Sequence, residues 1–241
     1  SKSICQNLAQ AFKSLSNFES EPLPMHFNAT LRTYQKEGYD WFYILKSNHF
    51  GGCLADDMGL GKTIQALALL QREKEIWQDQ IEKETSEITE ELIIETDSIS
   101  RKAEIKQISI FDQSLQGEAN LPDIKIKKSN IPRPSSLLVL PTSLVFNWVN
   151  EAKKFAPELR ILVHSGSSRI KDAKLFKLYD LVITTYGVMR LDIDILKQFK
   201  FHYIILDESQ NIKNPDSQTA RTARSLNSFN KLVLTGTPVE N

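Results

Sequence analysis

Short apolar runs bounded by turn residues recur from residue 52 onward, and each predicts a strand. They cover residues 52–55, 137–140, 160–164, 181–185, 203–206 and 231–234. Stretches with apolar residues at helical spacing lie between most of them, at residues 62–72, 144–155 and 217–226. Strands that alternate with helices in this way are typical of βαβ units. The pattern predicts an α/β fold of three layers, α-β-α, with a mainly parallel sheet.

The region ahead of the first strand predicts two helices. Residues 3–16 have a helical pattern that Pro22 and Pro24 end, so we expect residues 1–20 to form a separate helical leader. A second helix is expected at residues 33–47, within a domain that covers residues 21–241.

Residues 72–136 interrupt the alternation of strands and helices and are expected to be an insertion. Their first part is acidic and amphipathic, with Trp77, Ile81, Ile88 and Leu92 on one face. Their second part alternates isoleucines with polar residues and contains no strong strand. Because connections in α/β domains are normally much shorter, we expect a helical protrusion followed by a poorly ordered or hairpin-forming return.

The net charge of zero conceals an asymmetry along the chain. Residues 71–100 carry 3 basic and 10 acidic groups, whereas residues 101–241 carry 21 basic and 14 acidic groups. A solvated acidic helix beside an ordinary surface would explain these counts. The alternative is a basic face that meets nucleic-acid phosphates, and this interpretation needs independent motifs to support it.

Composition excludes several classes of protein. The apolar runs are far shorter than the roughly 20 residues of a bilayer-spanning helix, so no membrane partner is expected. The two cysteines, Cys5 and Cys53, form no CxxC pair, and there are only 4 histidines. A structural zinc site is therefore not expected, and a reducing, intracellular compartment is favoured. The location would be the cytoplasm, associated with the nucleoid, in a bacterium and the nucleus in a eukaryote.

A glycine-rich loop between the first strand and the following helix predicts a phosphate site. Gly59 and Gly61 allow backbone N–H groups to surround phosphate oxygens at the positive end of the helix dipole. Lys62 would reach the β and γ phosphates, and the Thr63 hydroxyl would bind Mg²⁺. The pattern departs from the general one at Asp56, which stands where a glycine is usual.

Two carboxylates at the end of the strand at residues 203–206 complete the predicted site. Asp207 and Glu208 follow this strand directly, and α/β sheets bind ligands at the carboxyl ends of their strands. Asp207 would hold the hydrated Mg²⁺, and Glu208 would orient and polarise the water that attacks the γ phosphate. ATP and Mg²⁺ are therefore the expected cofactors.

The ordered series of motifs resembles that of the Swi/Snf-type ATPases, in the helicase superfamily that includes the DEAD-box proteins. The matching segments are residues 31–41, 56–63, 141–155, 184–186, 207–210, 212–215 and 235–241. The family's P-loop also has an aspartate at the position of Asp56. Thr33 and Ser209 replace a proline and an alanine that the family commonly has, and neither change removes a ligand.

The resemblance assigns further roles to residues of this chain. It implies that Gln35 reads adenine and that Asp57, Met58 and Leu60 belong to the nucleotide-binding loop. The implied DNA contacts are Thr142, Ser143, Asn147, Trp148, Thr184, Thr185 and Tyr186. The residues implied to couple the ATP state to DNA are Thr235, Gly236 and Thr237.

Packing alternatives remain for several of these residues. Trp148 would equally serve to anchor its helix on the sheet. The polar residues after the strands could cap the following helices, although the resemblance favours contact with phosphates. None of the implied contacts offers bidentate base readout, so binding through the DNA backbone is expected.

The resemblance implies that residues 21–241 are the first RecA-like lobe of a double-stranded-DNA translocase. A second lobe, C-terminal to this chain, would supply arginine fingers. The sequence leaves two other functions open. One is a nucleotide-dependent regulatory switch that does not move DNA, and the other is an inactive interaction module that uses the acidic insertion.

Overall fold

The structure is a computed structural model that describes residues 19–57, 59–109, 131–166, 169–212 and 214–236, with only the backbone described for residues 88–109. The expected leader helix at residues 3–16 lies outside these ranges. Among the described residues, no helix has the length and apolar character needed to span a bilayer.

Six strands form one sheet in the order β1-β6-β5-β2-β4-β3, and every neighbouring pair is parallel. The strands are β1 (Gly52–Leu54), β2 (Ser136–Leu140), β3 (Ile161–His164), β4 (Leu181–Thr185), β5 (Phe201–Asp207) and β6 (Ser228–Leu234). The predicted α/β class and parallel sheet are confirmed. Because all strands run the same way, their carboxyl ends meet at one edge of the sheet.

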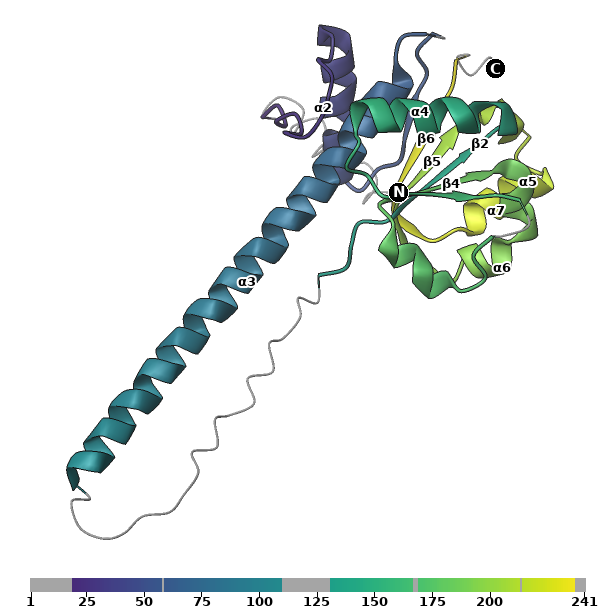
Figure 1. The fold of residues 1–241 in the computed structure, drawn as a ribbon. Coiled ribbons are helices and arrows are strands. Elements are labelled where there is room, and N and C mark those ends of the chain that lie inside the picture. Colours follow the sequence, from purple (N-terminus) through teal and green to yellow (C-terminus); the bar gives the residue numbers. More distant parts are fainter. Residues whose placement is uncertain (1–18, 58, 110–130, 167–168, 213, 237–241) are drawn as a thin grey trace, which may run out of the picture. The chain divides into compact units, whose positions relative to one another are not determined.

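Helices cover both faces of the sheet, as Figure 1 shows, with α4 (Val145–Phe155) on one side and α5 (Tyr186–Leu191), α6 (Ile193–Leu196) and α7 (Gln218–Ser225) on the other. All five residues of β2 are buried, as are all five of β4. Side chains of a strand alternate between faces, so a strand covered on both sides is mostly apolar. Leu137 and Val139 belong to one hydrophobic core cluster with Met189 of α5 and Ala223 of α7.

Short 3₁₀ helices complete the elements at the strand ends. They are η1 (Thr142–Leu144), η2 (Ala173–Leu178) and η3 (Ser209–Ile212).

The helix that follows the glycine-rich loop, α3, runs from Lys62 to Ser109. The expected end near Arg72 is therefore wrong, because the helix continues without a break into the acidic region. Glu, Gln, Lys and Ile dominate residues 73–83, and most of these are good helix formers. Residues Ile76–Ile131 form a compact unit of their own, in which the Trp77 indole N–H donates to the backbone oxygen of Ile131 at 3.1 Å. The expected alternation of isoleucines at residues 110–130 lies outside the described residues.

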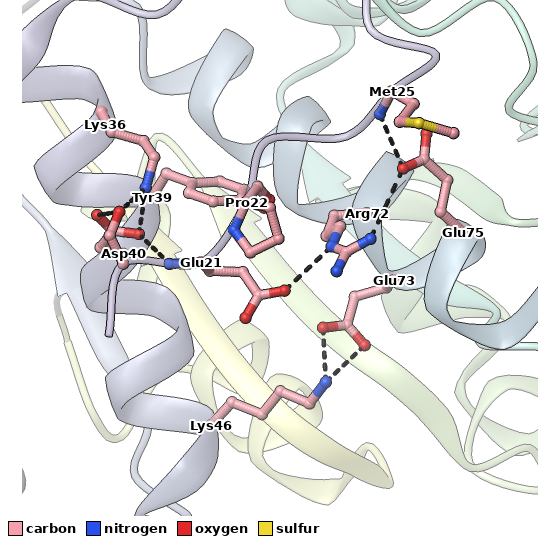
Figure 2. Close-up of polar contacts among 11 residues, drawn as sticks. Glu21, Pro22, Met25, Lys36, Tyr39, Asp40, Lys46, Arg72, Glu73 and Glu75 are labelled. Carbon is pink, nitrogen blue, oxygen red and sulfur yellow. Dashed lines mark hydrogen bonds and ion pairs between the residues drawn. The ribbon is translucent and has the colours of Figure 1, made fainter. Parts of the chain in front are cut away.

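Helix α2 (Thr33–Ser47) has the predicted bounds, and the segment before it ties it to the start of α3 (Figure 2). The Glu75 carboxylate accepts hydrogen bonds from the backbone N–H groups of Met25 and His26, both at 2.9 Å. The Glu21 carboxylate accepts a hydrogen bond from Arg72 Nε at 3.0 Å. Two charged residues of α3 thus hold the segment in place.

The same segment is fixed to α2 by polar contacts. The Tyr39 hydroxyl donates to the backbone oxygen of Pro22 at 2.8 Å, and the Asp40 carboxylate accepts from the backbone N–H of Glu21 at 3.0 Å. Because α2 carries Gln35 in its first turn, these contacts set the position of Gln35 relative to the glycine-rich loop.

Candidate functional site

The carboxyl edge of the sheet brings the predicted site segments together. The glycine-rich loop follows β1, and Asp207 ends β5 and pairs with Leu234 of β6. The segment beginning at Thr142 follows β2, and Thr184 and Thr185 end β4. Residues far apart in the sequence therefore share one edge because strand order places their strands side by side.

The glycine-rich loop has the backbone conformation that a phosphate-binding loop needs. Gly59 and Gly61 have φ angles of 86° and 82°, in the left-handed region that favours glycine. Apart from Gly59 and its two chain neighbours, no atom of the described residues lies within 4 Å of the position that a Cβ of Gly59 would take. The loop therefore borders open space beside the start of α3, and this arrangement fits an anionic phosphate.

The Lys62 side chain folds back over this loop. Its Nζ donates to the backbone oxygens of Asp56 and Asp57, at 2.7 and 3.0 Å. These carbonyl contacts hold the ammonium group at the loop, where a phosphate group would replace them as a stronger, charged acceptor. Met58 lies outside the described residues.

Gln35 reaches the same loop from α2. Its side-chain Nε2 donates to the backbone oxygen of Leu60 at 3.0 Å, and its Oε1 accepts from the backbone N–H of Arg32 at 2.9 Å. A Cβ at Gly61 would lie 2.4 Å from Gln35 Nε2, so only glycine permits this close approach. Gln35 is thus a direct contact between α2 and the glycine-rich loop, and its role toward adenine stays a prediction.

Asp207 is buried, with 6% of its surface exposed. Burial raises the pKa of its carboxyl group, while hydrogen bonds from Trp148 and the Glu208 backbone and the charge of Lys62 oppose this change. Asp207 ends β5 and Thr63 lies at the start of α3 after the glycine-rich loop, so both offer oxygen atoms at the same edge of the sheet. Oxygen donors fit Mg²⁺, which prefers oxygen ligands.

Glu208 adopts φ of 51°, which is uncommon for a residue with a side chain. Its backbone N–H donates to Asp207 Oδ1 at 2.9 Å, and its carboxylate accepts from Gln210 Nε2 at 2.8 Å. The strained turn thus follows directly on the end of β5, where the two carboxylates of Asp207 and Glu208 come one after the other. Strain of this kind is common at functional sites.

The implied DNA contacts fall into two groups in the structure. Thr142, Ser143 and Asn147 are exposed around the start of α4, where their polar groups are accessible to a ligand. Thr184 and Thr185 are buried, with 1% and 7% of their surfaces exposed.

The buried hydroxyls have partners within the protein. Thr184 donates to the backbone oxygen of His164 at 3.0 Å, and Thr185 accepts from the backbone N–H of Val188 as the N-cap of α5. Thr184 and Thr185 therefore fit the alternative in which these threonines cap helices and pack inside the protein.

Trp148 is buried too, with 2% of its surface exposed. Its indole Nε1 donates to Asp207 Oδ2 at 2.8 Å, and the Tyr186 hydroxyl donates to the backbone oxygen of Asp207 at 2.8 Å. Neither side chain is placed at the surface, so the anchoring alternative describes Trp148 better than direct DNA contact.

Comparison with known proteins decides the family. The SNF2-related domain family matches residues 34–241. This chain is a member of that family. It is 32% identical over 230 residues to the putative ATP-dependent helicase/translocase YwqA of Bacillus subtilis, covering 92% of this chain and 19% of that protein. It is 30% identical over 221 residues to the TATA-binding protein-associated factor MOT1 of Saccharomyces cerevisiae, covering 91% and 10%. The chain thus spans a fifth or less of these relatives.

Two solved structures of SNF2 proteins have the same fold. The Sulfolobus solfataricus SWI2/SNF2 ATPase core in complex with dsDNA has a TM-score of 0.62 and 32% identity, covering 93% of this chain and 35% of that one. The SWI2/SNF2 ATPase core domain from the same organism has a TM-score of 0.59 and 31% identity, covering 92% and 34%. This chain corresponds to about a third of each core.

The residues expected to couple nucleotide and DNA in this SNF2 domain follow β6. Thr235 is buried, and its backbone N–H donates to the oxygen of Leu54 at 3.1 Å. Gly236 is half-buried, and Thr237 lies outside the described residues. Thr235 thus ties the end of β6 to the strand that leads into the glycine-rich loop.

Sequence reasoning missed one residue that contacts the glycine-rich loop of this SNF2 domain. The Tyr34 hydroxyl donates to the backbone oxygen of Leu60 at 3.2 Å, beside the contact made by Gln35. The only signal was its place next to Gln35, because the contact depends on how α2 packs against a loop 26 residues further along the chain.

Proposed function

We propose that this chain is the nucleotide-binding lobe of an ATP-dependent translocase that moves along double-stranded DNA. The observation that carries the proposal is that the glycine-rich loop, Asp207 and Glu208 share one sheet edge with the exposed polar residues at the start of α4. The likeness to a SWI2/SNF2 ATPase core in complex with dsDNA supports the same function.

Each residue of the site has a chemical task in this proposal. Lys62 would exchange its backbone acceptors for the β and γ phosphates of ATP, and Thr63 and Asp207 would hold Mg²⁺. The metal, when bound, neutralises phosphate charge during the transfer. Glu208 would accept a hydrogen bond from the attacking water and so align it with the γ phosphorus.

Movement along DNA would need a second RecA-like lobe beyond this chain. The two lobes would close on ATP and reopen after hydrolysis. Their contacts with the duplex backbone would form and break in turn. Thr142, Ser143 and Asn147 would contribute the contacts of this lobe, through phosphates and without base readout.

ATP hydrolysis by the full-length protein, measured with and without linear duplex DNA, tests the proposal. We expect duplex DNA to stimulate hydrolysis and a triplex-forming third strand to be displaced as the enzyme moves. Glu208→Gln keeps the size and polarity of the side chain but loses the carboxylate. It should bind ATP normally and lose about 100-fold or more in turnover.

Lys62→Ala is the matched control, because it should weaken ATP binding itself. Binding of ATP with no effect of DNA on hydrolysis would indicate a regulatory switch. Absence of ATP binding in the parental protein would indicate an interaction module. Either result would contradict the proposal.

A further inference from the structure

Two elements that begin at the carboxyl edge converge on Asp207. From α4, the indole Nε1 of Trp148 donates to the Asp207 carboxylate at 2.8 Å. From α5, the Tyr186 hydroxyl donates to the backbone oxygen of the same residue, also at 2.8 Å. Both hydrogen bonds are buried, so water does not compete for either of them.

The hydrogen bonds to Asp207 leave lone pairs of its carboxylate available for a metal. Oδ2 accepts from Trp148 and Oδ1 accepts from the backbone N–H of Glu208, so each oxygen has one strong donor. A carboxylate oxygen has two lone-pair directions, and one therefore remains on each oxygen for a metal ion or its water. An indole N–H can only donate, so the Trp148 contact restricts the carboxylate to orientations that keep Oδ2 toward α4.

The position of Trp148 in α4 connects this contact with the exposed residues. Asn147 is the adjacent residue in the helix and is exposed, and Thr142 and Ser143 lie in the short helix η1 directly before α4. A short helix moves as a rigid body, so a ligand that shifts the start of α4 shifts Trp148 with it. The Asp207 carboxylate would then change its orientation.

We propose that Trp148 is a positioning residue that orients Asp207 toward the metal and transmits duplex binding at the start of α4 to the nucleotide site. Tyr186 holds the backbone of Asp207 from the opposite face of the sheet. This inference rests on the proposed function, and it assigns to Trp148 a role in place of direct DNA contact.

Trp148→Phe in the full-length protein tests the inference, because phenylalanine keeps an aromatic ring in the core and removes the N–H. The Mg²⁺ concentration that half-saturates binding of a fluorescent ATP analogue should rise about 10-fold or more, as with other residues that orient metal ligands. Affinity for the same analogue in EDTA should stay within about twofold of the parental value. A purely structural defect would lower both affinities.

Trp77→Phe is the matched control. It removes the same kind of indole hydrogen bond, to the backbone oxygen of Ile131, inside the separate unit Ile76–Ile131. It should leave the Mg²⁺ dependence unchanged. Tyr186→Phe removes only a hydroxyl group and serves if Trp148→Phe does not fold. It should shift the Mg²⁺ dependence in the same direction.

A second measurement separates this inference from the proposed function. If the parental protein hydrolyses ATP in response to duplex DNA, Trp148→Phe should reduce the stimulation factor at saturating Mg²⁺. If the parental protein shows no such response, the proposed function and the transmitting role fail, while the Mg²⁺ titration still tests the orientation of Asp207. An unchanged Mg²⁺ dependence in both Trp148→Phe and Tyr186→Phe would overturn the inference.

Discussion

Glu73 connects three elements through one buried carboxylate. Its side chain, in α3 and 4% exposed, lies 2.6 and 2.8 Å from Lys46 Nζ of α2 and 2.6 Å from His202 Nε2 of β5. Burial alone would raise the pKa of this carboxyl group. The hydrogen bond from His202 and the charge of Lys46 outweigh burial, so the pKa lies below its ordinary value.

A lowered pKa in the folded state makes the stability contribution of Glu73 depend on pH. The contribution is complete above the pKa of an unfolded glutamate, about 4.3, and is lost as pH falls through the lower folded value. We expect Glu73→Gln to lower the free energy of unfolding by about 2–4 kcal/mol at pH 7, because it breaks a buried ion pair. The difference from the parental protein should shrink below about pH 4.

Urea unfolding at pH 7 and at successively lower pH measures this difference. Glu87→Gln, at an exposed position of α3, is the control and should change stability little at any pH. Parallel stability curves for Glu73→Gln and the parental protein would contradict the expectation.

At the scale of single residues, the sequence predicts where a functional side chain lies when its location depends only on its distance along the chain from the end of a strand. Lys62, Asp207 and Glu208 were predicted in this way, since each directly follows a strand or its loop. The contact of Trp148 with Asp207 was not, because it joins residues 59 positions apart and depends on the packing of α4 over the sheet. Periodicity carries no information about such a pairing.

At the scale of elements, α3 has two parts with different surroundings. Its residues 66–71 are all buried in the α/β domain, whereas residues 79–87 are mostly exposed. The sequence predicted both parts as helical but placed a boundary at residue 72, where the composition becomes acidic. Their acidic and charged composition placed Glu73, Lys74 and Glu75 in the predicted insertion. In the structure these residues are buried, and ion pairs compensate for the burial of their charges.

Removal of the unit Ile76–Ile131 should leave the α/β domain folded. Glu75 and Pro132 would be joined by a short Gly/Ser linker, and shortening a surface connection changes closure entropy little. We expect the melting temperature of the full-length protein to change by less than several degrees.

A longer deletion that begins at Glu73 provides the contrast. It also removes the partners of Lys46, His202 and the Met25 backbone, so it should lower the melting temperature strongly. Equal effects of the two deletions in differential scanning calorimetry would refute the distinction.

At the scale of the whole molecule, the chain has a glycine-rich loop and a carboxylate pair at one sheet edge but spans only part of the length of its relatives. An arginine finger contributes a factor of about 10³–10⁵ in phosphoryl transfer. We expect the 241-residue chain, purified alone, to hydrolyse ATP at close to background rate with or without duplex DNA, because its fingers would come from a second lobe.

Phosphate release from the purified chain, compared with its Lys62→Ala variant, checks this expectation. DNA-stimulated turnover that disappears in Lys62→Ala would mean that the chain has its own charge-stabilising arginine. Arg221 and Arg224 of α7 would then be the first to substitute.

The pairing of β1 sets the order in which this domain is completed as it is made. Within the part of the chain that the structure describes, β1 is an edge strand that pairs only with β6, and residues 55–227 separate the two strands. At a synthesis rate of about 5–20 residues per second, roughly 9–35 s pass before the ribosome supplies the partner of β1. β1, which leads into the glycine-rich loop, is made early but can join the sheet only once β6 has been made. If the proposed function is right, ATP would therefore stabilise the domain only after β6 has emerged.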